Sequence, residues 1–264
     1  NAAGLGTCDD GIVIDLSRMT AVHVNPNTQR VLVEGGATWG DVDHATAPFG
    51  LAVPCGIIST TGVGGLTLGG GFGYLSRKHG LTIDNLVSAD LVLADGSFVT
   101  ASETEHSDLF WAIRGGGGNF GVVTAFEFQA QPVSTVTAGV LFYDLDKSAE
   151  LMKLYRTFID TAPRELGIFF GFLMTPPAPF LPEELHLKNM AKMVYCFDGP
   201  EAEARDVIAP FLAIGPAAEV GGEMPFAMWN AMFDALFPPG RQDYWKADYL
   251  SDITDEIIDV HLQF

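Results

Sequence analysis

Glycine is concentrated in one short stretch of this chain: seven of the twelve residues from Gly62 to Gly73 are glycine. Dense glycine lets backbone amides approach a ligand closely and point toward it together. Residues 31–76 contain no Lys or Arg, so a phosphate held here would be bound by amides and by the hydroxyls of Ser59, Thr60, Thr61 and Thr67. A tight turn or a close strand crossing without a ligand explains the glycines equally well.

Familiar nucleotide and metal motifs do not fit this sequence. No G-x-x-x-x-G-K-[ST] pattern occurs, which argues against a P-loop. The G-x-G-x-x-G at Gly116, Gly118 and Gly121 follows an expected helix, Leu109–Arg114, and precedes an expected strand, Val122–Phe128. A dinucleotide fingerprint needs the opposite order, strand before helix. The histidines show no H-x-x-x-H or H-E-x-x-H spacing and the cysteines no C-x-x-C, so we expect no metal site.

Charge and composition exclude several classes of partner. The 264 residues carry 14 basic and 33 acidic side chains, a net charge of −19, which disfavours nucleic acid and anionic lipid. Hydrophobic residues make up 48%, enough for a substantial core. The longest uncharged run, 45–76, holds nine glycines and two prolines, so it is a poor membrane helix. Three widely spaced cysteines and no secretory segment favour a cytoplasmic location.

The element pattern predicts an α+β fold in two domains, residues 1–132 and 133–264, divided near Pro132. Turns at Asn25-Pro-Asn-Thr and Asp95-Gly96 predict two hairpins in the first domain. In the second, helices Lys147–Asp160 and Glu201–Leu212 carry apolar stripes on one side, so they should cover one face of an antiparallel sheet. The aromatic-rich stretch Met224–Leu236 is expected to be helical.

Three stretches resemble one known family. They are Val53 to Leu86, which contains Gly-Ile-Ile-Ser-Thr-Thr-Gly-Val-Gly-Gly-Leu-Thr-Leu-Gly-Gly-Gly-Phe-Gly; Asp108 to Thr124; and Val31-Leu-Val-Glu-Gly-Gly-Ala-Thr-Trp-Gly. Their order and spacing are similar to FAD-linked oxidases of the vanillyl-alcohol oxidase and p-cresol methylhydroxylase fold, in the berberine-bridge-enzyme-like branch. The likeness is strong over residues 1–132 and loose beyond, and it favours a ligand-binding role for the glycines.

The resemblance implies a fold and a set of cofactor contacts. Residues 1–132 would be the second subdomain of a PCMH-type FAD-binding domain, and 133–264 part of a substrate-binding domain. The residues expected to bind FAD are Gly56, Ile57, Ile58, Ser59, Thr60, Thr61, Gly62, Gly64, Gly65, Leu66, Gly121, Val122 and Val123. The sheet of the second domain would also line a substrate pocket, with Phe170, Phe172 or Tyr195 facing Thr61 and Leu66.

The sequence departs from the family at points that bear on flavin linkage. Ile58 stands where bicovalent relatives carry a cysteine, and Leu66 where they carry histidine, so we expect no cysteinyl linkage at residue 58. Cys55 does not align with the linking cysteine and is expected to be a buried structural thiol. A histidyl linkage would use a residue upstream of Asn1. The uncapped end at Phe264 and the non-Met start lead us to expect a fragment, inactive by itself, so we assign no catalytic base.

The resemblance implies an FAD-dependent oxidoreductase. Such an enzyme would take a hydride from the C–H of an alcohol, sugar or secondary metabolite and pass electrons to dioxygen or another acceptor. The alternative is a non-catalytic binding or scaffold protein that keeps the fold without flavin. A flavin absorbance band in the purified full-length protein would discriminate between the two.

Overall fold

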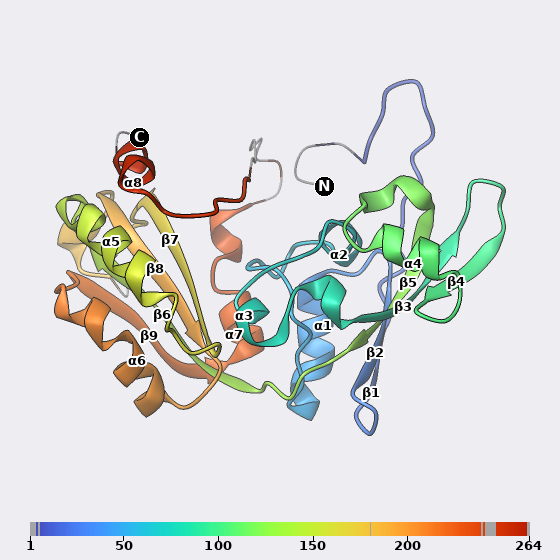
Figure 1. The fold of residues 1–264 in the computed structure, drawn as a ribbon. Helices are drawn as coiled ribbons and strands as arrows, with labels where there is room; N and C mark the ends of the chain where they lie inside the picture. Colours follow the sequence, from blue (N-terminus) through green and yellow to red (C-terminus); the bar gives the residue numbers. More distant parts are fainter. Residues whose placement is uncertain (1–3, 5, 180, 239, 241–246, 263–264) are drawn as a thin grey trace. The chain divides into compact units, whose positions relative to one another are not determined.

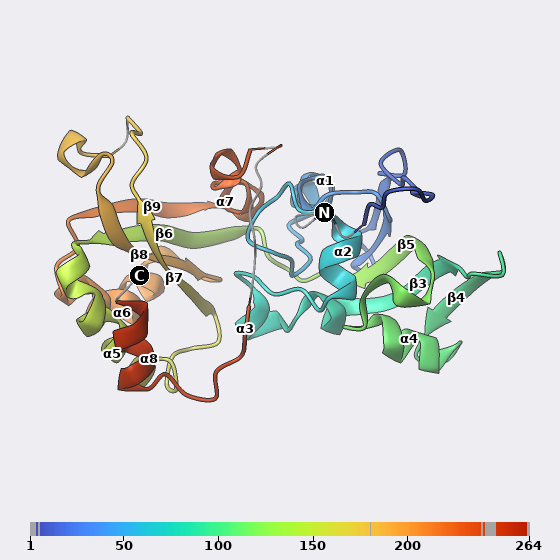
Figure 2. The same cartoon turned by 90° about the horizontal axis from the view of Figure 1, so that it is seen from above.

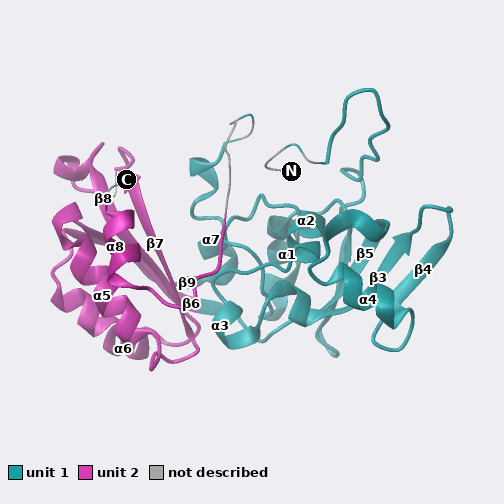
Figure 3. Cartoon of the chain, turned by 45° about the horizontal axis from the view of Figure 1, so that its top comes forward, with its two compact units in different colours: residues 1–135, 225–245 teal, residues 136–224, 246–264 magenta. Residues whose placement is uncertain are grey.

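The computed structural model describes all residues except 1–3, 5, 180, 239, 241–246 and 263–264 (Figure 1). The chain forms two compact units, unit 1 from residues 1–135 and 225–245, and unit 2 from residues 136–224 and 246–264 (Figure 3). Helices combined with antiparallel strand pairs confirm the α+β class. Placing all of 133–264 in one domain was wrong, because residues 225–245 return to unit 1, where Phe226 and Trp229 are buried.

Unit 1 is built on a five-stranded sheet with the order β1-β2-β5-β3-β4. Its strands are β1 (Val22–Asn25), β2 (Arg30–Glu34), β3 (Leu86–Val92), β4 (Phe98–Ser102) and β5 (Val122–Gln129). Its helices are α1 (Trp39–Thr46), α2 (Val63–Leu68), α3 (Ser76–His79), α4 (Ser107–Ile113) and α7 (Phe226–Asn230). Short 3-10 turns are η1 (Ala47–Phe49), η2 (Thr82–Asn85), η3 (Gly117–Phe120) and η6 (Asp234–Leu236). Both expected hairpins are present, as β1–β2 and β3–β4.

The start of helix α1 is held firmly against the core of unit 1. Thr38 caps the helix: its backbone N–H donates to Asp41 Oδ2 at 2.8 Å, and its hydroxyl accepts from the Asp41 N–H at 3.4 Å. Trp39 is fully buried, with its ring centroid 5.7 Å from that of Phe128 on β5. A cap of this kind contributes about 1 kcal/mol, and the buried indole anchors the first turn of α1 on the sheet.

Unit 2 contains a four-stranded sheet with the order β7-β8-β6-β9. Its strands are β6 (Thr135–Tyr143), β7 (Leu166–Met174), β8 (Asn189–Phe197) and β9 (Ala218–Pro225). Its helices are α5 (Ser148–Phe158), α6 (Glu201–Ala213) and α8 (Asp255–His261), with 3-10 turns η4 (Leu145–Lys147) and η5 (Glu183–Leu185). As expected, α5 and α6 lie on the same side of this sheet (Figure 1, Figure 2).

The aromatic residues predicted to line a substrate pocket instead pack beneath these helices. Phe170 lies 5.0 Å from the ring of Tyr155 on α5 and 6.5 Å from that of Phe211 on α6. Tyr195 is 1% exposed within the same cluster, and Phe172 packs against it. Because successive side chains of a strand alternate between faces, all three belong to the helix-covered face. Their assignment to a substrate pocket was therefore wrong: they fill the gap between the sheet and the apolar stripes of α5 and α6.

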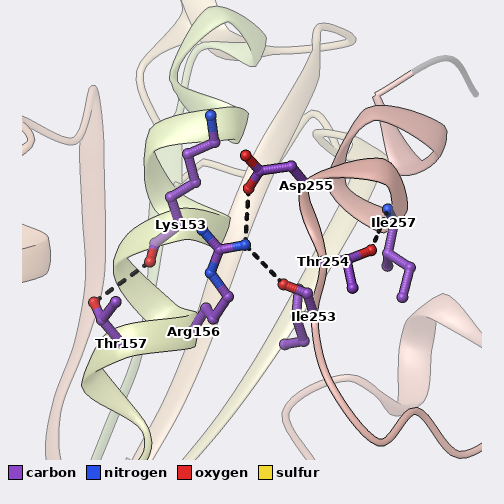
Figure 4. A network of polar contacts seen from close by, with 7 residues as sticks. All are labelled: Lys153, Arg156, Thr157, Ile253, Thr254, Asp255 and Ile257. Atoms are coloured by element: carbon purple, nitrogen blue, oxygen red, sulfur yellow. Dashed lines mark hydrogen bonds and ion pairs between the residues drawn. The ribbon is translucent and has the colours of Figure 1, made fainter.

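Helix α8 docks on α5 through polar contacts at its first turn (Figure 4). The Arg156 guanidinium on α5 donates to Asp255 Oδ1 at 2.8 Å and to the Ile253 carbonyl at 3.0 Å. Thr254 caps α8 by accepting from the Ile257 N–H at 3.2 Å. The Arg156 hydrogen bond lowers the pKa of Asp255.

Within the described residues, no helix is both long and apolar enough to cross a membrane.

Candidate cofactor-binding site

The loop before the glycine-rich helix runs alongside the start of α1. The Gly40 N–H donates to the Ser59 carbonyl at 2.8 Å and the Trp39 N–H to the Thr61 carbonyl at 3.0 Å. The Val63 N–H then donates to the Ala37 carbonyl at 2.9 Å, and α2 begins. The first two bonds hold the loop against α1, because the loop carbonyls accept from N–H groups in the first turn of α1 that have no partner within the helix.

One group of glycines is explained by close packing alone. A Cβ built at Gly73 would lie 2.0 Å from the Cys55 carbonyl oxygen. At Gly71, where φ is +73°, it would lie 2.3 Å from Thr82 Oγ1. Any side chain at these two positions collides with its neighbours, so the interpretation of the glycines as a ligand-free close crossing holds for this part of the block.

A second group faces open space. Cβ atoms built at Gly62 and Gly65 would meet no heavy atom within 4 Å, and both residues are exposed. Neither has a positive φ, so backbone conformation does not require glycine at either position. At Gly64 the Cβ would lie 3.3 Å from the Gly35 carbonyl oxygen, a tight contact with the backbone of another segment. Gly62 and Gly65 thus leave a bare backbone surface at the start of α2.

The second glycine cluster lies beside the first. The Gly115 N–H donates to the carbonyl of Leu68, the last residue of α2, at 3.1 Å. Gly121 has φ +151°, and its Cβ would lie 2.8 Å from the Val92 carbonyl oxygen, so this glycine is needed for packing. Helix α4 precedes the cluster and strand β5 follows it, as expected for a sequence that is not a dinucleotide fingerprint.

Sequence reasoning missed three polar residues at this site. The Asp234 carboxylate accepts from both the N–H (3.0 Å) and the hydroxyl (2.5 Å) of Ser59. The Asn230 amide donates to Asp43 Oδ2 at 2.7 Å and to the Cys55 sulfur at 3.4 Å. The partners are 175 or 187 residues apart, so no local pattern pairs them. One signal was present: Asp43 is four residues after buried Trp39, on the same face of α1.

Asp43 sits in an environment that favours its neutral form. The residue is 3% exposed, and burial raises its pKa to about 7, with the nearby Asp234 charge adding to the rise and the Asn230 hydrogen bond opposing it. Asp43 Oδ1 and Asn230 Oδ1 are both buried without a partner among the described residues. A proton on Asp43 gives these two oxygens a hydrogen-bond donor, which they lack when Asp43 is ionised.

The structure confirms that Cys55 is buried, with 2% of its surface exposed. Burial raises the pKa of its thiol well above the usual range, and the nearby Asp43 raises it further. Since the thiolate is the reactive form, this side chain is a poor nucleophile.

Among the described residues, no group of three or more His, Cys, Asp or Glu side chains is arranged to hold a metal ion.

Comparison with known proteins shows which proteins this chain is similar to. Residues 1–102 match the family model described as an FAD binding domain. The chain is similar to FAD-linked oxidoreductases with the PCMH-type, berberine-bridge-enzyme-like fold, the family that the sequence motifs resemble.

Particular relatives make the likeness concrete. The chain is 41% identical over 221 residues to the FAD-linked oxidoreductase pgmH of Aspergillus terreus, covering 82% of this chain and 43% of that protein. It is 48% identical over 127 residues to the xylooligosaccharide oxidase of Thermothelomyces thermophilus, covering 48% of this chain and 26% of that one. A solved structure of 6-hydroxy-D-nicotine oxidase from Arthrobacter nicotinovorans superposes with a TM-score of 0.76 at 29% identity, covering 91% of this chain and 52% of that one. The chain spans about half the length of the curated relatives it matches.

The residues of unit 1 fit the cofactor of this family. An FAD pyrophosphate needs clustered donors, and its flavin ring needs a close backbone approach without side chains in the way. The bare surface at Gly62 and Gly65 meets the second need, and the exposed Thr60 next to it provides a hydroxyl. Ser59 differs from the other predicted contacts, because Asp234 already engages its N–H and hydroxyl.

Proposed function

We propose that this chain is part of an FAD-dependent oxidoreductase that removes a hydride from the C–H of an alcohol, sugar or secondary metabolite. Electrons would pass to dioxygen or to another acceptor. The observation that carries the proposal is the open backbone surface at Gly62 and Gly65, in a loop held on α1, in a chain whose residues 1–102 match an FAD-binding family.

The residues of unit 1 would bind and orient the cofactor. Backbone groups of Gly56 to Gly65 and of Gly121 to Val123 would line it, and the apolar side chains of Ile57, Ile58 and Leu66 would exclude water beside it. When bound, a flavin supplies the two-electron acceptor that amino-acid side chains lack. Ile58 offers no thiol, so the flavin would not be cysteinyl-linked at this position.

The substrate class is proposed from relatives with different specificities. One relative is named a xylooligosaccharide oxidase and another (R)-6-hydroxynicotine oxidase. The stronger local identity, 48% over 127 residues, is to the sugar oxidase, against 44% over 129 residues for the other. Both matches cover about half of this chain, so we propose that an oligosaccharide or a secondary metabolite is the first substrate to test.

The experiment uses the purified full-length protein. A flavin absorbance band that persists through gel filtration is expected, followed by bleaching of that band when a substrate is added without oxygen. Hydrogen peroxide released in air would identify an oxidase, and turnover only with an added dye would identify a dehydrogenase. A colourless protein that fails to take up added FAD would contradict the proposal and favour a non-catalytic scaffold.

A further inference from the structure

The segment Phe226–Leu236, which contains α7 and η6, contacts both ends of the candidate cofactor loop, Cys55–Ser59. At one end the Asn230 amide donates to the Cys55 sulfur at 3.4 Å. At the other, Asp234 accepts from the N–H and the hydroxyl of Ser59. The loop between these two contacts is Gly56–Ile58, with exposed Ile57 and half-buried Ile58.

This segment is itself anchored in the core of unit 1. Trp229 is 1% exposed, and its ring lies 5.3 Å from that of Tyr74 and 5.5 Å from that of Phe233. The Phe226 N–H donates to the Ser134 carbonyl at 2.9 Å. Buried aromatic contacts of this kind hold a backbone in one position, so the polar groups of Asn230 and Asp234 are presented from a rigid support.

The polar contacts are charge-assisted or buried, and such contacts are stronger than exposed neutral ones. The Asp234 carboxylate receives two hydrogen bonds from one residue, which fixes both the backbone and the side chain of Ser59. Asn230 is fully buried and bridges Asp43 on α1 to Cys55. The loop is therefore tied to two different helices, α1 and α7, through one amide.

We propose that the segment Phe226–Leu236 is a brace that sets the conformation of the cofactor loop, with Asp234 and Asn230 as positioning residues for the flavin. This inference rests on the proposed function. Ser59 is then a structural residue of the loop rather than a phosphate donor, and the side chains of this loop left to face the cofactor are those of Ile57, Ile58 and Thr60, beside the bare glycines. Loss of the Asp234 carboxylate should loosen the loop without removing any group that touches the cofactor.

The test compares Asp234→Asn and Ser59→Ala with wild type in the full-length protein, with Asp160→Asn as the control. Asp160 is exposed, and Asp160→Asn makes the same carboxylate-to-amide change at a position outside the loop. Flavin-free protein is titrated with FAD, the visible circular dichroism of the bound flavin is recorded, and thermal unfolding is followed. We expect Asp234→Asn to weaken FAD binding about ten-fold, as for a lost charged hydrogen bond, and to alter the flavin dichroism, while Asp160→Asn changes neither.

A double-mutant cycle tests whether the brace acts through the contact between Asp234 and Ser59. Ser59→Ala and Asp234→Asn remove two sides of this contact, so their combined effect on FAD affinity should be smaller than the sum. If Asp234→Asn fails to fold, Ser59→Ala still tests the contact. Tighter FAD binding in Asp234→Asn would mean that Asp234 competes with the cofactor for Ser59, and a lower melting temperature with unchanged dichroism would mean a purely structural contact. Either result overturns the brace, and a wild-type protein that binds no FAD overturns the proposed function as well.

Discussion

Substitution of Gly65 separates a glycine that faces a ligand from one that is required for packing. A methyl group at Gly65 enters open space, since no heavy atom lies within 4 Å of its built Cβ. Alanine in a helix is favoured over glycine by about 0.5–1 kcal/mol, so Gly65→Ala should stabilise the flavin-free protein by up to that amount. If the cofactor lies against this backbone, the same methyl overpacks the contact and weakens binding by about 1–3 kcal/mol, or roughly 5- to 150-fold in Kd.

The assay measures both quantities on one protein. Chemical unfolding of the flavin-free form gives the free energy of unfolding, and flavin fluorescence during FAD titration gives the Kd. Gly73→Ala is the opposite control: its Cβ would lie 2.0 Å from the Cys55 carbonyl, so stability and binding should fall together. If Gly65→Ala binds FAD like wild type, the bare surface at Gly62 and Gly65 is not a cofactor contact. A loss of stability in Gly65→Ala would show that this glycine is needed for packing.

Cys55, Asp43 and Phe170 each offer a further test. Cys55→Ser should keep its flavin, because this thiol is buried and its pKa is raised; loss of in-gel flavin fluorescence under denaturing conditions would contradict it. The folded-state pKa of Asp43, about 7, lies above its ordinary 3.8. The free energy of unfolding should therefore fall by up to about 4 kcal/mol as pH rises from about 4 to about 7. Asp43→Asn should flatten this pH dependence in unfolding curves. Phe170→Ala should destabilise unit 2 by about 3 kcal/mol, the low end for this change because the side chain is only partly buried, without changing KM for a substrate; a changed KM at unchanged stability would restore Phe170 to the pocket.

The elements of unit 1 could be predicted from local signals. Asn25-Pro-Asn-Thr and Asp95-Gly96 form the two hairpin turns, and Thr38 with Asp41 caps α1. Each of these signals acts over a few residues, because turns and caps are hydrogen-bonded within one chain segment. The order of α4, the glycine cluster and β5 was also readable, and it ruled out a dinucleotide fingerprint.

The face on which the aromatic residues of unit 2 lie could not be predicted from the sequence. Alternation along β7 places Phe170 and Phe172 on one face, but only the register with β8 places Tyr195 there too, and alternation does not say which face meets the helices. The apolar stripes of α5 and α6 required large partners, and the packing with Tyr155 and Phe211 shows that these residues supply them. Similarly, the expected helix Met224–Leu236 is only partly helical: residues 231–233 separate α7 from η6, and Asn230 and Asp234 lie on the two sides of this break.

The order and spacing of three sequence stretches pointed to the family, and the glycine-rich stretch among them gave the candidate cofactor loop. Only the tertiary structure decided which glycines are packed and which are open, since Gly73 and Gly65 differ in what lies opposite them and not in their local sequence. The contacts of Asp234 with Ser59 and of Asn230 with Asp43 depended on it too. They join residues at least 175 positions apart, and such pairs become neighbours only because the segment that contains buried Trp229 packs against α1 in unit 1.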